Sequence, residues 1–221
     1  ASILSASMPI GSIISGILSD KIGRKLTLHF QTSVVVLGWV LVAAAQSHAV
    51  MLVGRFVSGF ASGLGIVACQ VYMAEVSTPA ARGILTSAPF VSDALGILVV
   101  YALGAFLQWR LVAGLSTICA IMSIIMYFMY PESHVWLIRQ GKIKKATDAC
   151  AWFRGNNVQQ AHKEIEEIIT RFKNEKIEKY NWNSILQPYT LKPLIITATF
   201  NLLQAFSGVY VVVFYATDII T

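Results

Sequence analysis

Residues 16–25, GILSDKIGRK, separate two long apolar runs with a short charged segment. The charged residues of this segment are Asp20, Lys21, Arg24 and Lys25. The segment also contains Gly16 and Gly23, and glycine adopts backbone conformations that other residues avoid, so two helices can reverse direction there within a few residues. The segment predicts a helix hairpin with a charged tip.

The composition indicates a membrane protein. Hydrophobic residues make up 56% of the 221 residues and charged residues only 13%, which is too apolar for an ordinary soluble domain. The formal net charge of +6 could indicate a nucleic-acid partner, but the placement of the basic residues favours a lipid bilayer and no nucleic acid. The three cysteines form neither a disulfide framework nor a metal-ligand spacing, and we expect them to be packing residues.

Six apolar stretches are long enough to cross a bilayer as helices, which takes about 20 residues. They cover residues 1–19, 27–47, 50–73, 84–107, 109–130 and 192–218. The third contains GRFVSGFASGLG, residues 54–65, in which small residues recur at a spacing of four positions. Such a spacing lets helix backbones approach closely, and a generic tight helix contact is favoured here over a direct role with a substrate.

Basic residues lie in alternate connections between these stretches. Lysines and arginines follow the first, third and fifth stretches, whereas the two other short connections contain only Arg110. Because an excess of lysine and arginine marks the cytoplasmic side, the sequence predicts a multi-pass protein with residues 131–191 in the cytoplasm.

The polar segment 131–191 predicts two or three short amphipathic helices. Apolar residues such as Ile165, Ile169 and Phe172 recur at helical spacing between charged neighbours. A disordered basic linker is the alternative, and the helical period favours helices that pack on the cytoplasmic ends of the bundle. We therefore divide the chain into a bundle of five spans over 1–130, a cytoplasmic linker over 131–191 and one further span over 192–221.

Several motifs, in this order, resemble the sugar porter family of the major facilitator superfamily. GILSDKIGRK is similar to the loop between the second and third helices of that superfamily. It is followed by Gly54-Arg55, VYMAEVSTPAARG at 71–83, PESHVWL at 131–137, FRG at 153–155 and QAFSGVYVVVFY at 204–215. Within the family, Pro89, WRL at 109–111 and Phe206 resemble the group of insect facilitated trehalose transporters.

The resemblance implies an all-α membrane fold, a partial bundle of the twelve-helix type that runs from the second to the seventh helix. It implies a plasma-membrane transporter of trehalose or a hexose that works by alternating access, and it favours facilitated over proton-coupled transport. We expect no metal, because the four histidines are scattered along the chain. We also expect no enzyme activity, no catalytic residue and no cofactor, because the sequence has neither a nucleophile elbow nor a glycine-rich loop between a strand and a helix. A fragment of this kind is expected not to transport sugar by itself.

The resemblance also implies a conformational latch at the cytoplasmic ends of the helices. The matching positions are Asp20, Arg24, Arg55, Glu75, Arg82 and Glu132. Opposite charges that are partly dehydrated there should pair strongly. Orientation by positive charge is the alternative, but it explains only the basic residues and leaves Asp20 and Glu75 unexplained.

The expected substrate-binding residues depart from the family pattern. They are Phe90, Asp93, Ile97, Gln204 and Tyr210. In the seventh helix the family pattern is Gln-Gln-x-Ser/Thr-Gly-Ile-Asn, which has three amide side chains. Only the first of them has a counterpart in this chain, Gln204. An ionisable Asp93 inside a span could hold a proton or a cationic solute, or it could be a neutral, hydrogen-bonded residue. These departures leave a non-sugar solute, a non-transporting sensor or receptor, and a decayed relative as alternatives.

Overall fold

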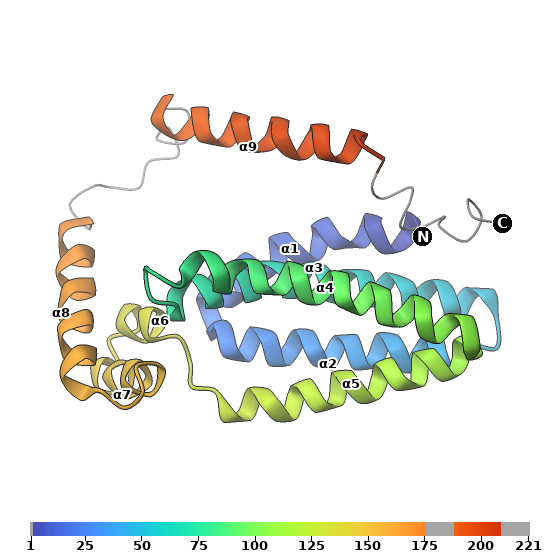
Figure 1. The fold of residues 1–221 in the computed structure, drawn as a ribbon, viewed down its shortest axis with the longest axis horizontal. Coiled ribbons are helices and arrows are strands. Elements are labelled where there is room, and N and C mark those ends of the chain that lie inside the picture. Colours follow the sequence, from blue (N-terminus) through green and yellow to red (C-terminus); the bar gives the residue numbers. More distant parts are fainter. Residues whose placement is uncertain (1, 176–187, 209–221) are drawn as a thin grey trace. The chain divides into compact units, whose positions relative to one another are not determined.

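The computed structural model describes residues 2–175 and 188–208, and in these ranges it contains nine helices and no strand (Figure 1). Five helices are long and apolar enough to cross a membrane. They are α1 (Ser2–Ile22), α2 (Arg24–Ala43), α3 (His48–Val76), α4 (Arg82–Phe106) and α5 (Trp109–Met129). The first five predicted spans and the all-α fold class are thereby confirmed.

Shorter helices follow the five long ones. They are α6 (His134–Arg139), α7 (Ile143–Phe153), α8 (Val158–Glu175) and α9 (Pro188–Phe206). Within 134–175 the predicted amphipathic helices are confirmed and the disordered linker is wrong, since α7 buries Ala146 and Cys150 and α8 buries Ile165. The second half of the sixth predicted span lies outside the described residues.

The chain forms two compact units, which are described separately. One unit covers Ser2–Ile169 and includes α1 to α7 with the first part of α8. The other begins at Thr170 and includes α9. Most of the segment that the sequence suggested as a linker therefore belongs with the five long helices.

Helix α3 is the centre of the first unit, because it packs against both α1 and α2, and α2 in turn packs against α5. Glycines make these contacts close. A Cβ atom at Gly59 or Gly63 would collide with the backbone carbonyl oxygens of Leu4 or Met8 on α1. The predicted tight helix contact is thus confirmed, and it buries Leu64 completely.

Gly23 alone makes the turn between α1 and α2. Its φ of 100° lies in the region that favours glycine, and it separates the last residue of α1 from the first residue of α2. The expectation that Gly16 also serves the turn is wrong. Gly16 lies inside α1, and a Cβ atom there would meet nothing within 4 Å.

We expect Gly63→Ala to destabilise the protein and Gly16→Ala not to. The new methyl group at position 63 meets backbone, which cannot rotate away, so the loss should be about 1–3 kcal/mol as for other overpacked sites. At position 16 alanine fits and favours the helix. Thermal unfolding of the two purified variants measures the difference, and equal unfolding midpoints would contradict the close contact of α1 and α3.

Candidate functional site

A buried ion pair joins the start of α2 to the end of α3. The side chain of Arg24 is only 3% exposed and that of Glu75 13%. Arg24 Nε donates to Glu75 Oε2 over 3.0 Å, and Nη2 donates to Oε1 over 2.9 Å. This two-pronged geometry fixes both side chains and compensates for the removal of the guanidinium from water.

The remaining donors of Arg24 bind the end of α1. Nη1 donates to the carbonyl oxygen of Ser19 over 3.0 Å, and Nη2 lies 3.2 Å from Asp20 Oδ1. The Asp20 side chain is 68% exposed, so water screens its ion pair with Arg24 more than it screens the pair with Glu75. One guanidinium therefore connects α1, α2 and α3 at the same end of the bundle.

Glu132 binds the backbone at the start of α2. Its Oε1 accepts from the N–H groups of Arg24 over 3.1 Å, Lys25 over 3.0 Å and Ser133 over 2.9 Å. A carboxylate at a helix N-terminus satisfies free N–H groups and interacts favourably with the helix dipole. Any Cβ atom at Gly23 would collide with this carboxylate, which gives a second reason for glycine there.

The PESHVWL motif attaches α6 to the same place. Ser133 Oγ donates to Glu75 Oε2, and Trp136 Nε1 donates to the carbonyl oxygen of Asp20 over 3.0 Å. Tyr72 of α3 donates to the carbonyl oxygen of Pro131 over 2.8 Å. We call Asp20, Arg24, Glu75, Glu132, Ser133 and Trp136 the Arg24 network, and it joins α1, α2, α3 and α6.

A second arginine pair links α7 and α8 to the end of α3. Arg154 donates to both carboxylate oxygens of Glu164 over 2.8 and 2.7 Å, and to the carbonyl oxygen of Val76 over 3.1 Å. The hydrogen bonds from Arg154 hold the pKa of Glu164 below its usual range. Sequence reasoning missed this pair. The FRG motif before an amphipathic helix pointed to Arg154. The sequence does not show which of several glutamates in that helix is its partner.

Two of the predicted latch residues do not join the Arg24 network. Arg55 lies near the opposite end of α3 from Glu75, because twenty intervening helical steps of 1.5 Å make about 30 Å. The expectation that Arg55 lies near Glu75 is therefore wrong. Arg82 is the first residue of α4 and is exposed, and it forms no ion pair with any residue that the structure describes.

The predicted substrate-binding residues lie on two helices. Phe90, Asp93 and Ile97 are all exposed and share one face of α4, as their spacing of three and four residues requires. No residue of α4 is buried. Gln204 is exposed on α9, in the second unit. Tyr210 lies outside the described residues.

The Arg24 network predicts that substitution of Glu75 lowers the free energy of unfolding more than substitution of Arg82 does. Glu75→Gln keeps the shape but leaves the guanidinium of Arg24 buried without its main counter-charge, so we expect a loss of about 3 kcal/mol in unfolding free energy. Arg82→Gln removes a charge that has no ionic partner among the described residues and should leave stability nearly unchanged. Thermal unfolding of both purified variants measures this. A large loss with Arg82→Gln, or none with Glu75→Gln, would contradict the network.

Comparisons with known proteins give a single family. Residues 1–221 match the family described as sugar (and other) transporter. The chain is 34% identical to facilitated trehalose transporter Tret1 of Apis mellifera ligustica, over 99% of this chain and 44% of that protein. It is 31% identical to the human solute carrier family 2, facilitated glucose transporter member 6, over 95% of this chain and 41% of that protein. The chain thus spans about two fifths of these relatives.

The fold agrees with solved structures. The xylose transporter XylE from E. coli, in a partially occluded inward-open conformation, matches 98% of this chain with a TM-score of 0.77 and 21% identity, and the match covers 54% of that structure. A second structure, the proton:xylose symporter XylE bound to 6-bromo-6-deoxy-D-glucose, gives a TM-score of 0.78 at 19% identity. At these identities the likeness concerns the fold, which is that of the major facilitator superfamily.

Proposed function

Because the chain belongs to the family of sugar (and other) transporters, we propose that it serves in the facilitated transport of a sugar, trehalose or a hexose, by alternating access. The observation that carries the proposal is the family match over the whole chain, together with five helices fit to cross a membrane. The family and the relatives are transporters, and no catalytic activity is indicated.

The Arg24 network supports a mechanical role in this proposal. In the major facilitator fold, two bundles rock against each other around a central site, so each bundle has to move as a rigid piece. The network holds the ends of α1, α2, α3 and α6 together with a buried pair and several backbone contacts. Asp20 pairs with Arg24 but is 68% exposed, and we propose it as the member whose contact breaks and re-forms during transport.

We propose sugar-binding residues in each unit separately. In the first unit they are Phe90, Asp93 and Ile97 on one face of α4, and in the second unit the residue is Gln204. An aromatic ring offers a flat apolar surface to a sugar ring, and an amide both donates to and accepts from hydroxyl groups without the cost of burying a charge. The exposure of the three α4 residues leaves them available for this contact. We include Tyr210 in the proposal on the family resemblance alone.

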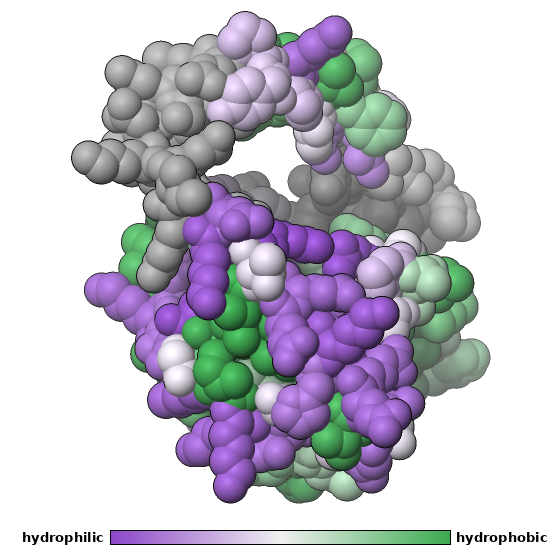
Figure 2. Space-filling view, turned by 90° about the vertical axis from the view of Figure 1, so that its left-hand side faces the viewer, coloured by the Kyte–Doolittle hydropathy of each residue, from purple (hydrophilic) through white to green (hydrophobic). Residues whose placement is uncertain are grey.

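The surface charge supports the proposed orientation in the plasma membrane. Figure 2 shows a largely hydrophilic face over α6, α7 and α8. Exposed basic residues of this region include Arg139, Lys142, Lys144 and Lys145. Helices α1 to α5 expose mainly apolar side chains instead, as lipid contact requires. This distribution supports the proposal that residues 131–191 lie in the cytoplasm.

The orientation can be tested with introduced cysteines. In a chain whose native cysteines are replaced by serine, we expect Lys144→Cys to react with a membrane-impermeant maleimide only after the cells are permeabilised. Gln108→Cys, in the exposed connection between α4 and α5, should react in intact cells and serves as the matched control. Labelling of Lys144→Cys from outside would contradict the orientation.

The transport proposal predicts saturable sugar uptake by the protein that carries this chain. The protein is expressed in a yeast strain that lacks the yeast hexose carriers. Labelled trehalose or glucose should enter at a rate that persists when the proton gradient is collapsed. Gln204→Ala should raise the half-saturating sugar concentration several-fold, because a hydroxyl hydrogen bond is lost, whereas Gln108→Ala should not.

Three other results of the uptake measurement would contradict parts of the transport proposal. Sugar binding without uptake would overturn transport in favour of a sensor. An uptake rate that falls with the proton gradient would contradict the facilitated mechanism and make Asp93→Asn the next variant to measure. Absence of both binding and uptake for every sugar would overturn the sugar substrate.

A further inference from the structure

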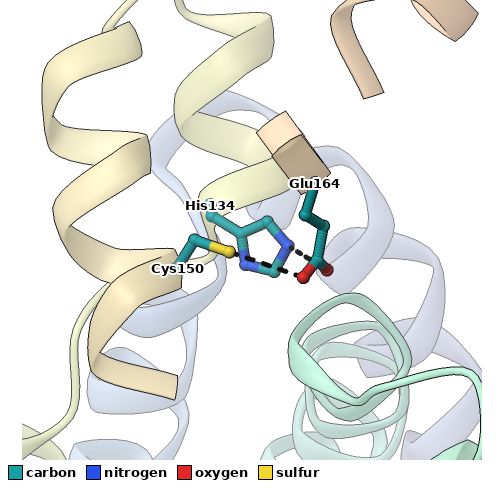
Figure 3. Close-up of side chains that lie close together, drawn as sticks. All are labelled: His134, Cys150 and Glu164. Carbon is teal, nitrogen blue, oxygen red and sulfur yellow. Dashed lines mark hydrogen bonds and ion pairs between the residues drawn. The ribbon is translucent and has the colours of Figure 1, made fainter. Parts of the chain in front are cut away.

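Three side chains from three different helices meet outside the Arg24 network. His134 comes from α6, Cys150 from α7 and Glu164 from α8, and Figure 3 shows that the thiol and the imidazole each contact the carboxylate of Glu164. Their possible ligand atoms all lie within 4.8 Å of one another. Cys150 is fully buried and His134 is 1% exposed, while the Glu164 side chain, at 26%, reaches solvent.

The imidazole of His134 has no good hydrogen bond. Its Nδ1 is buried and has no hydrogen-bond partner among the described residues. Its Nε2 lies 3.8 Å from Glu164 Oε1, which is too far for a hydrogen bond. Buried polar atoms without partners are rare and costly. Neither ring nitrogen of His134 is therefore committed to a hydrogen bond with a described residue, and either can serve as a metal ligand.

The spacing of the three groups suits a tetrahedral metal ion. Zinc bonds of about 2.0–2.3 Å at tetrahedral angles place two ligand atoms about 3.4–3.6 Å apart. Here Cys150 Sγ lies 3.7 Å from Glu164 Oε2, and His134 Nε2 lies 3.8 Å from Oε1. These two contacts reach different oxygens of Glu164, and all the ligand atoms lie within 4.8 Å of one another. A closure of the cluster by about an ångström would therefore bring sulfur, nitrogen and one carboxylate oxygen to the ligand spacing of a zinc ion.

We propose that His134, Cys150 and Glu164 form a binding site for Zn²⁺. A thiolate with an imidazole and a carboxylate is a donor set that zinc favours over calcium or magnesium. The exposed side of Glu164 leaves the fourth position to water. Sequence analysis predicted no metal here because the ligands are separated by 16 and 14 residues and converge only through the packing of α6, α7 and α8.

Binding of Zn²⁺ requires a deprotonated thiol at Cys150 and a neutral imidazole at His134. Burial is the main cause that raises the pKa of the Cys150 thiol to about 11, so the metal-free thiol is protonated and Zn²⁺ displaces its proton to solvent. Burial also lowers the pKa of His134 to about 4, so the imidazole is already neutral and able to bind metal.

Among the described residues, Arg154 is the cation whose charge acts on the site, and it can stay when a metal binds. It donates to both oxygens of Glu164, but a carboxylate offers about four acceptor positions, so each oxygen keeps one for a metal. Hydrogen-bonded carboxylates are common among metal ligands, because the hydrogen bond fixes their orientation. The positive charge will make the site weaker than one with four protein ligands.

The test uses the full purified chain, without an affinity tag, and Co²⁺ as a coloured substitute for Zn²⁺. We expect a thiolate-to-cobalt absorption band that saturates at one equivalent and disappears when Zn²⁺ is added. Cys150→Ser should abolish the band, and His134→Gln should weaken cobalt affinity at least about tenfold. Cys119→Ser and His162→Gln change exposed residues of the same types and should leave the titration unchanged.

A second measurement keeps the test independent of colour. Zn²⁺ should raise the thermal unfolding midpoint of the unaltered chain and of the two control variants, but not that of Cys150→Ser, which is nearly isosteric with the parent. Absence of the thiolate band in the parent, or its persistence in Cys150→Ser, overturns the proposal. Loss of the band in Cys119→Ser would place the metal elsewhere and overturn it equally.

Discussion

The buried pair of Arg24 and Glu75 is the interaction on which the described end of the bundle depends. A guanidinium that is 97% removed from solvent is stable only if its donors are satisfied, and those of Arg24 are bound by Glu75, Asp20 and the carbonyl oxygen of Ser19. These partners come from the ends of α3 and α1. The pair can therefore form only when the α1–α2 turn is closed and α3 has its full length.

Helix α3 connects this pair to the short helices α6, α7 and α8. Its last two residues are bound by two arginines, since Glu75 pairs with Arg24 and the carbonyl oxygen of Val76 accepts from Arg154. Arg154 in turn holds Glu164, so α7 and α8 are tied to the same helix end as α6. Glycine contacts anchor the middle of α3 to α1. Movement of the bundle would thus be passed directly to α6, α7 and α8.

The two proposed sites differ in how the fold presents them. The α4 face with Phe90, Asp93 and Ile97 is exposed along a helix that buries nothing, which suits a surface that meets a solute or another helix. The cluster of His134, Cys150 and Glu164 is mostly buried and held by three short helices, which suits a fixed ion. One proposal relies on accessible side chains and the other on side chains already brought together.

The sequence by itself determined the five long helices, the amphipathic character of 134–175 and the family, because apolar length, helical period and motif order are local properties of the chain. The motifs also indicated that Asp20, Arg24, Glu75 and Glu132 lie at one end of the bundle, but tertiary structure decided which of the six expected latch residues meet. The length of α3 separates Arg55 from Glu75, and Glu132 reaches the start of α2 only because α6 returns to the α1–α2 turn. The pairing of Arg154 with Glu164, and the approach of both to His134 and Cys150, depends on how three helices pack. Such contacts are set by helix lengths and packing, which no spacing in the sequence records.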